Sequence, residues 1–364
     1  MWGRSAGRCE YPGCNKPLYE DEPTKIEFNS AYIAHIVAAS PGGPRGNSKL
    51  SGELKHDINN LMLLCDTHHR LIDNEQVENH TVEILQKYKK NHENRIALVT
   101  GIGDKKRSEV ILYGAKIGAS SSPLRKNLAY QELLNHGYIP ASENPYEIGL
   151  KNFMSQDDCN DFFNTEMKNL EQHISNFRRE KLNSERIAHL SIFAFAPQPL
   201  LAYFGALISD ITPTEVYQIQ RDTHEWHWPS NDNSDPFITR EADTVAHEVA
   251  IIISISSTIN KERVHNLLGE NIPIWEISIE KPHPDFLKSK YHLNYFRQSY
   301  RKVLNKIRNM DGLPKKIHIF PATPVSIAVE IGRMRNQKAD LPLVMYDQNN
   351  KKDGFWKVLT IGAE

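Results

Sequence analysis

The chain has 364 residues, a formal net charge of −1, 24% charged residues and 39% hydrophobic residues. This length suggests two or three domains and excludes a minimal module that needs staples to fold. The balanced charge argues against a protein that coats nucleic acid by bulk electrostatics. No apolar run approaches the roughly 20 residues of a membrane helix, and the first residues lack the apolar core of a signal peptide. We therefore expect a cytoplasmic protein without a membrane partner.

Cysteine and histidine are concentrated near the start of the chain, in residues 1–103, which we interpret as one compact domain. Cys9 and Cys14 form one close pair, and Cys65 and His68 form a second. Two close pairs that lie far apart in sequence are typical of a tetrahedral zinc site in a small domain. The alternatives are a disulfide, which a cytosolic chain disfavours, or buried thiols; the fourth cysteine, Cys159, lies far away.

A second set of residues overlaps the first. His35 is followed by a glycine pair at residues 42–43, by Asn60 in an apolar run over residues 60–65, and by His69 directly after His68. This combination resembles the HNH nuclease family over roughly the first hundred residues. The resemblance implies a small zinc-containing ββα-metal domain that acts as a metal-dependent DNA endonuclease. It also implies that His35 is the general base, that Asn60 holds its imidazole in the right tautomer, and that His69 binds a catalytic Mg²⁺ or Mn²⁺.

The chain departs from the commonest HNH pattern at one position. Members of the family often have an acidic residue or a histidine before the first motif histidine, whereas this chain has Ala34. Asp73 follows His69 by four residues, so a helix would place both on one face. We predict that Asp73 is the second ligand of the catalytic metal. The alternative is an ordinary aspartate at a helix end, and His56 and Asp57 are further nearby candidates.

The rest of the chain changes in character twice. Residues 104–154 are expected to be a linker, because glycine, serine and lysine are frequent there and residues 120–123 break any periodicity; one short strand is expected at 109–113. After a helical connector over about 155–186, apolar strand-like runs occur at 187–196, 249–255, 272–279, 316–320, 343–346 and 355–361. Helical stretches, such as 200–208 and 325–333, separate them. Continuous apolar strands between helices predict an α/β fold with a mainly parallel sheet covered on both faces.

A weak internal repeat marks two junctions between a strand and a helix. The first junction contains Pro197 and Pro199, and the second contains Pro321 and Pro324. Proline is tolerated at the start of a helix because its missing N–H would be unpaired there anyway. Two Rossmann-like halves would produce this repeat, and both helix starts would then offer backbone N–H groups to phosphates in one crevice.

The second half of the chain resembles the SAVED domain, a sensor family related to CARF domains that is fused to effectors in CBASS antiphage defence. The matching runs are residues 190–201, 216–221, 318–325 and 330–332, together with Trp226 and Trp228. The resemblance implies that residues 155–364 form two fused CARF-like halves and bind a cyclic di- or trinucleotide messenger. It further implies a homo-oligomer, which is a dimer at rest and a higher oligomer when the messenger is bound. The ligand-bound oligomer would then degrade double-stranded DNA nonspecifically.

The residues themselves support nucleotide binding. Trp226 and Trp228 follow Arg221 in a polar, proline-containing stretch. Indole rings can stack on bases, and an arginine can bind a phosphate with two parallel hydrogen bonds. The alternative for the tryptophans is that at least one fills the edge of the core. A basic helical pattern over residues 287–316 is compatible with a solvated face, a DNA track, a subunit contact or a phosphate ligand.

Two other functions are compatible with these motifs. One is an HNH restriction endonuclease whose C-terminal domain reads DNA, which would cut without any added nucleotide. The other is a non-enzymatic, zinc-stabilised binding module, which would not depend on His35.

Overall fold

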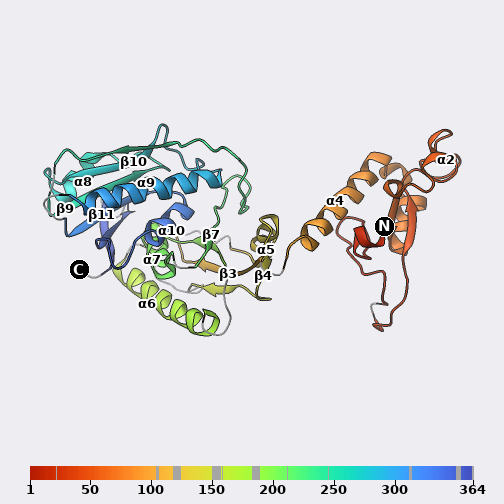
Figure 1. Cartoon of the computed structure of the whole chain (residues 1–364), viewed down its shortest axis with the longest axis horizontal. Helices are drawn as coiled ribbons and strands as arrows, with labels where there is room; N and C mark the ends of the chain where they lie inside the picture. Colours follow the sequence, from red (N-terminus) through yellow and green to blue (C-terminus); the bar gives the residue numbers. More distant parts are fainter. Residues whose placement is uncertain are drawn as a thin grey trace. The chain divides into compact units, whose positions relative to one another are not determined.

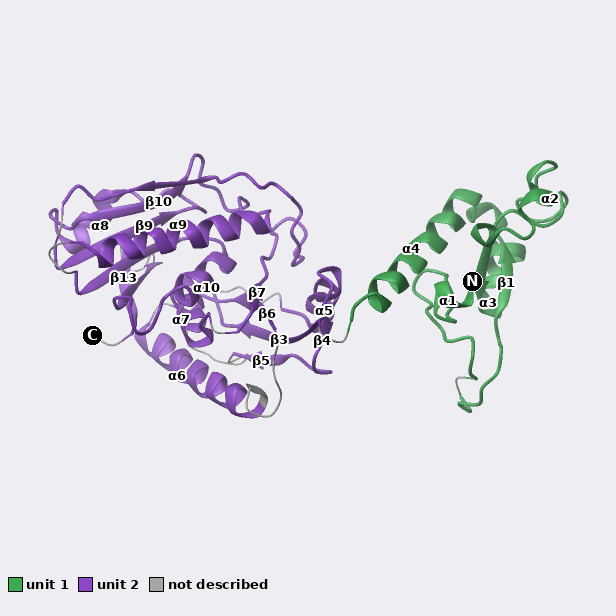
Figure 2. Ribbon diagram, viewed as in Figure 1, with its two compact units in different colours: residues 1–103 green, residues 104–364 purple. Residues whose placement is uncertain are grey.

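The computed structural model of the chain describes residues 1–21, 23–103, 106–117, 124–149, 157, 159–182, 189–210, 212–244, 246–310, 314–349 and 354–362. The chain divides into two compact units, Met1–Gly103 and Asp104–Glu364, shown in green and purple in Figure 2. Across the described residues, the helices are too short or too polar to cross a membrane.

Unit 1 is built on a two-stranded antiparallel sheet followed by a helix. Strand β1 (Tyr32–His35) pairs with β2 (Leu61–Leu64) so that His35 lies opposite Leu61, and α3 (Asp66–Arg70) begins immediately after β2. The other elements are α1 (Trp2–Ser5), α2 (Leu50–Leu54), the short helices η1 (Ile58–Asn60), η2 (Leu71–Glu75) and η3 (Val77–Asn79), and α4 (Val82–Thr100). The buried apolar cluster of this unit is small and includes two of the cysteines, Cys9 and Cys65.

The described residues of unit 2 form two sheets. The first is all parallel, with strands in the order β4-β3-β6-β7 and with β5 also paired to β3. Its strands are β3 (Arg107–Gly114), β4 (Ile139–Pro140), β5 (Tyr146–Ile148), β6 (Leu190–Phe195) and β7 (Thr214–Val216). The second sheet has the order β13-β12-β11-β9-β10-β8, in which the four inner strands are parallel and the two edge strands are antiparallel. Its strands are β8 (Phe237–Arg240), β9 (Glu248–Ser254), β10 (Ile274–Ile279), β11 (Lys316–Ala322), β12 (Leu343–Asn349) and β13 (Gly354–Ile361).

Helices cover both faces of these sheets. The main core joins the inner faces of the two sheets to α6 (Asn160–Phe177), α7 (Gln198–Ile208), α9 (Lys290–Arg308) and α10 (Val325–Arg333) (Figure 1). Smaller clusters form on the outer faces, under α5 (Lys126–Asn135) for the first sheet and α8 (Lys261–Leu268) for the second. Successive β9 residues alternate between clusters, since Ile251 and Ile253 face the main core while Ala250 and Ile252 face α8. The prediction of an α/β fold with mainly parallel strands that are apolar on both faces is confirmed, although the strands form two sheets and not the single sheet expected.

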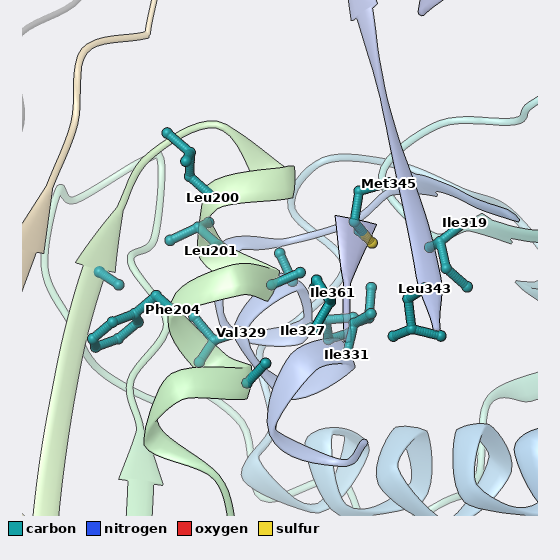
Figure 3. Packing of buried hydrophobic residues seen from close by; sticks show 14 of the residues in the cluster. Leu200, Leu201, Phe204, Ile319, Ile327, Val329, Ile331, Leu343, Met345 and Ile361 are labelled. Carbon is teal, nitrogen blue, oxygen red and sulfur yellow. The ribbon is translucent and has the colours of Figure 1, made fainter. Parts of the chain in front are cut away.

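The two helices that follow the proline junctions pack directly on each other. Side chains of α7, including Leu201 and Phe204, lie beside Ile327 and Val329 of α10 in Figure 3. The backbones approach so closely that a Cβ at Gly205 would overlap the carbonyl oxygen of Val329. A Cβ at Gly332 would likewise overlap the carbonyl oxygen of Ala202.

The prediction that residues 104–154 form a linker is wrong, because this segment belongs to unit 2 and contributes a strand to its first sheet. Strand β3 is buried and lies between β6 on one side and β4 and β5 on the other. Helix α5 covers this sheet through Ala129 and Leu133. The strand expected at 109–113 is present as β3, whereas the frequent glycine, serine and lysine of the segment did not indicate that it is folded. Residues 104–105, 118–123 and 150–154 lie outside the described residues. The predicted connector is also part of the core, since α6 buries Phe163, Leu170 and Phe177.

We expect Gly332→Ala to destabilise unit 2 by about 1–3 kcal/mol, because the added methyl group overlaps backbone atoms that cannot rotate away. Gly52→Ala is the control, since Gly52 also lies in a helix but its Cβ would meet open space. Denaturant unfolding followed by tryptophan fluorescence measures both variants. Equal stability of Gly332→Ala and the parent would show that the α7–α10 contact is not tight.

Candidate functional site

The structure brings together the four residues that the sequence proposed as zinc ligands. The sulfur atoms of Cys9, Cys14 and Cys65 and a ring nitrogen of His68 all lie within 4.8 Å of one another. The Nδ1 atom of His68 is 3.1 Å from the Cys65 sulfur and 3.7 Å from the Cys9 sulfur. Ligand atoms around a tetrahedral zinc ion are about 3.8 Å apart or slightly closer, so these four side chains could bind zinc after movements of about 1 Å or less.

Local structure holds each member of this cluster. Cys65 is the N-cap residue of α3, which places His68 one turn later on the same side. Cys9 and Cys14 flank a tight turn in which Gly13 has a φ of 79°, and Tyr11 in that turn stacks on the His68 ring at 4.1 Å. Burial lowers the pKa of His68, with a smaller contribution from His80, and so favours the neutral imidazole that binds metal. Burial also raises the pKa of the Cys9 thiol.

The imidazole of His35, at the end of β1, is held by the main chain. Its Nε2 atom is 3.0 Å from the carbonyl oxygen of Lys55 and therefore donates a hydrogen bond to it. In the neutral ring, this assignment leaves the lone pair on Nδ1. A half-buried imidazole with this tautomer, whose Nδ1 has no hydrogen-bond partner among the described residues, has the geometry of a general base.

The prediction that Asn60 bonds the ring of His35 is wrong. The Asn60 side chain accepts from the backbone N–H of Val37 at 2.8 Å and donates to the carbonyl oxygens of Val37 at 2.9 Å and Leu54 at 3.1 Å. Asn60 directly precedes β2 and pairs by its own carbonyl with Ile36, so its side chain reaches the main chain beyond β1. Asn60 is connected to His35 only indirectly. It binds the carbonyl oxygen of Leu54, and the carbonyl oxygen of the next residue, Lys55, binds the His35 ring.

Asp73 lies beside His69, as the four-residue spacing predicted. The Oδ2 atom of Asp73 is 3.3 Å from Nε2 of His69, and Tyr32 stacks on the His69 ring at 4.9 Å. The other oxygen of Asp73 accepts a hydrogen bond from Arg45 at 2.5 Å. Two ligand atoms at a right angle around an octahedral Mg²⁺ are about 3.0 Å apart, so the His69 and Asp73 atoms fit such an ion after a small movement. His56, one of the other candidates, is exposed.

In unit 2, the two tryptophans separate into different environments. Trp226 is 2% exposed and packs on Phe193 in the cluster under α5, so the prediction that it stacks on a ligand is wrong. Its large apolar ring is more stable in the core than in a polar loop. Trp228 lies at the wall of two adjoining cavities, of about 530 and 270 Å³.

The cavities beside Trp228 combine aromatic, cationic and anionic groups. Lys290, at the start of α9, lines both and binds Glu215 at 2.6 Å. The smaller cavity also has Arg297 and Tyr138, and the Tyr138 ring stacks on His189 at 4.1 Å. The larger cavity is lined by Glu132, Asn135, His136, His227, Trp228, Ser230, Asn231, Lys290, Tyr291 and Asn294. This set can stack on a flat ring, bind an anion and accept hydrogen bonds from amino groups.

The other predicted ligand contacts lie elsewhere. Arg221 is exposed, and its Nε atom lies 3.9 Å from a carboxylate oxygen of Asp285. The prolines of the two junctions, Pro197, Pro199, Pro321 and Pro324, are buried. The expectation that the second junction offers free N–H groups to a phosphate is wrong for Thr323 and Ser326. Gln198 accepts from the backbone N–H of Thr323 at 3.0 Å, and Gln218 accepts from that of Ser326 at 3.2 Å.

Reasoning from the sequence missed Arg45, Lys290 and the Tyr138–His189 pair. Lys290 lies within the basic stretch 287–316, so that pattern contained a usable signal. Tyr138 and His189 are adjacent only because β3, which precedes Tyr138 in the chain, pairs with β6, which follows His189. No local pattern indicates such a contact.

Comparison with known proteins identifies one family. The model described as "SAVED: SMODS-associated and fused to various effectors sensor domain" matches residues 170–361, which is more than half of the chain. No curated protein matches the sequence.

Solved structures give a weaker likeness. A Cap4 SAVED/CARF-domain containing receptor of Acinetobacter baumannii with the cyclic trinucleotide 3'3'3'-cAAA is 14% identical, with a TM-score of 0.45 over 88% of this chain and 68% of that chain. The same receptor with the cyclic trinucleotide 2'3'3'-cAAA is 14% identical, with a TM-score of 0.46 over 87% of this chain and 67% of that chain. The Cap4 SAVED/CARF-domain containing receptor of Moraxella osloensis is 11% identical, with a TM-score of 0.44 over 79% of this chain and 64% of that chain. At these TM-scores, the likeness supports no conclusion about this chain.

We expect the purified chain to carry one tightly bound zinc ion, because three sulfurs and one imidazole nitrogen converge in unit 1. Cys65→Ser should lose the zinc and unfold unit 1, since the metal joins the turn at Cys9 to the start of α3. Cys159→Ser, outside the cluster, should keep the full zinc content. Elemental analysis and thermal unfolding measure both effects, and a zinc-free parent that is stable in chelator would contradict the assignment.

Proposed function

Because the chain belongs to the SAVED family of sensor domains, we propose that unit 2 binds a cyclic oligonucleotide and thereby activates unit 1 as a metal-dependent DNA endonuclease. The observation that carries this proposal is the family match over residues 170–361 beside a separate unit 1, since SAVED domains are fused to effectors. In this proposal, the protein is a cytoplasmic CBASS effector that degrades double-stranded DNA nonspecifically once a phage infection raises the messenger.

The contacts of unit 1 are suited to phosphodiester hydrolysis. Nδ1 of His35 accepts a proton from water, while the Lys55 carbonyl holds the opposite ring nitrogen and stabilises the imidazolium that forms. The resulting hydroxide attacks phosphorus, the bond to the 3′ oxygen breaks, and the departing alkoxide takes a proton from solvent to give the 3′ hydroxyl. His69 and Asp73 would hold a magnesium or manganese ion, which supplies positive charge to the phosphate oxygens and the leaving group. Cys9, Cys14, Cys65 and His68 would hold a structural zinc ion.

The cavities beside Trp228 are the best candidate for the messenger site. Their volumes, about 530 and 270 Å³, lie around the lower part of the range of roughly 300–1,000 Å³ that is usual for small-molecule sites. Trp228 and Tyr138 offer ring faces for bases. Lys290, which also binds Glu215, and Arg297, which also binds Glu330 at 2.7 Å, are the cationic groups that a phosphate would meet. Glu132 can accept a hydrogen bond from an exocyclic amino group. A cyclic oligonucleotide presents all three of these groups in one compact ligand.

Activation by such a ligand requires a difference in affinity between two states. The messenger must bind an assembled, DNA-competent oligomer more tightly than the resting one, and that preference limits how completely the switch turns on. Near-neutral net charge suits a nuclease that is kept off DNA until it assembles.

We expect linear double-stranded DNA to be cut only when Mg²⁺ and the correct cyclic nucleotide are both present. His35→Ala should lower the cleavage rate by about 10²–10⁴-fold, because the general base is removed. His247→Ala, which removes an exposed histidine of unit 2, should cut like the parent. Electrophoresis of the DNA after incubation with a panel of cyclic di- and trinucleotides measures these rates.

Three outcomes of this assay are decisive. Equal cleavage with and without every nucleotide would refute the sensor role and favour a restriction endonuclease whose C-terminal domain reads DNA. Full activity of His35→Ala would refute the assigned base. Absence of any cleavage, together with specific DNA binding, would favour a zinc-stabilised binding module.

A thermal-shift screen tests the messenger site separately. The correct nucleotide should raise the melting temperature in proportion to the logarithm of its concentration above the dissociation constant. Lys290→Ala should weaken binding about 10- to 100-fold, since a hydrogen bond from a charged donor contributes roughly 1.5–3 kcal/mol. Arg221→Ala is the matched control, because its side chain is exposed and outside the cavities. The reverse ranking of the two variants would move the site to Arg221.

A further inference from the structure

Arg45 is a buried arginine in the loop between β1 and α2. Its side chain is 6% exposed, and its backbone adopts a φ of 57°, in the left-handed region. All three guanidinium nitrogens have partners. Nε donates to the carbonyl oxygen of Ile36 at 2.8 Å, one terminal nitrogen donates to that of Ile72 at 2.7 Å, and the other binds Asp73 at 2.5 Å.

These partners come from the two segments that carry the proposed nuclease chemistry. Ile36 follows His35 directly, and the nitrogen that binds Asp73 also lies 3.4 Å from the carbonyl oxygen of His35. Ile72 and Asp73 belong to η2, which continues from the helix that carries His69. The planar guanidinium group of Arg45 therefore connects the end of β1 to η2, directly after the helix that carries His69.

The contact with Asp73 determines how its carboxylate is oriented. With one oxygen bound to Arg45, the other is directed to Nε2 of His69 at 3.3 Å. Without that restraint, the carboxylate could rotate and leave the metal-binding direction. Replacing a residue that hydrogen-bonds to a metal ligand, without touching the metal itself, commonly weakens metal binding by about 10–100-fold. A buried arginine is costly to desolvate, which argues that its fixed geometry serves more than packing.

We propose that Arg45 is a positioning residue that holds the metal-ligand carboxylate of Asp73 toward His69 and fixes the backbone of the base His35. The inference rests on the proposed nuclease function. It assigns to Arg45 no contact with DNA, water or metal.

The test compares Arg45→Lys with Arg70→Lys in the full-length protein. Arg70 is the matched control, because it makes an exposed pair with Asp66 on the helix that carries His69. The Mn²⁺ affinity is measured by the loss of the free-ion electron paramagnetic resonance signal, and zinc content reports whether unit 1 is folded. Arg45→Lys should keep its zinc and bind Mn²⁺ about 10–100-fold more weakly, because an ammonium cannot reproduce the planar set of contacts. Arg70→Lys should match the parent.

A double-variant cycle separates positioning from a general structural role. Asp73→Asn should itself lower the Mn²⁺ affinity, and adding Arg45→Lys should then lower it no further, because Arg45 acts through Asp73. Additive losses of Mn²⁺ affinity would overturn the inference. Loss of both zinc and Mn²⁺ in Arg45→Lys and Arg45→Gln would also overturn it, since the arginine would then serve the fold. If the parent binds no Mn²⁺, or if its Mn²⁺ binding is unchanged in His69→Ala, the proposed catalytic metal site itself is refuted.

Discussion

Unit 2 depends on the contact between α7 and α10. Both helices lie in the core shared by the two sheets, and each follows a strand of a different sheet. Gly205 and Gly332 allow the two backbones to touch, so the apolar side chains on either side reach both sheets at once. A wider separation would leave gaps along the inner faces, where close packing supplies most of the stability. The side-chain bonds from Gln198 and Gln218 to the start of α10 hold the same two halves together at the junctions.

Unit 1 is organised differently. Its apolar cluster is small, and its segments are joined by the Cys/His cluster and by the hydrogen bonds of Arg45. The turn at Cys9 and Cys14 meets the start of α3, and Arg45 connects η2, which follows α3, to the end of β1. The candidate catalytic residues lie on these same segments. His35, His69 and Asp73 are therefore held by the interactions that also hold the unit together. A site built this way is rigid, which favours accurate placement of a base and a metal ion.

Local patterns in the sequence predicted the elements whose signals are local. The runs at 249–255 and 355–361 are strands, 200–208 and 325–333 are helices, and Asp73 is one helical turn from His69, because these features depend only on periodicity and spacing. The linker prediction for 104–154 was wrong although the strand expected at 109–113 is present as β3, because the pairing of β3 with β4, β5 and β6 cannot be read from local composition. Trp226 and Asn60 were misassigned because their partners, Phe193 and the main chain of Val37, are distant in sequence.

The sequence by itself determined the division into a cysteine- and histidine-rich unit and an α/β unit, the four residues of the Cys/His cluster, and the resemblance to SAVED domains. Only the tertiary structure decided which polar groups meet. It directed the Asn60 amide to the backbone, placed Arg45 on Asp73, buried Trp226 and left Trp228 beside Lys290. The physical reason is that apolar periodicity is a property of neighbours along the chain. A hydrogen bond or a cavity wall instead depends on how strands and helices pack, which residues far apart in sequence decide together.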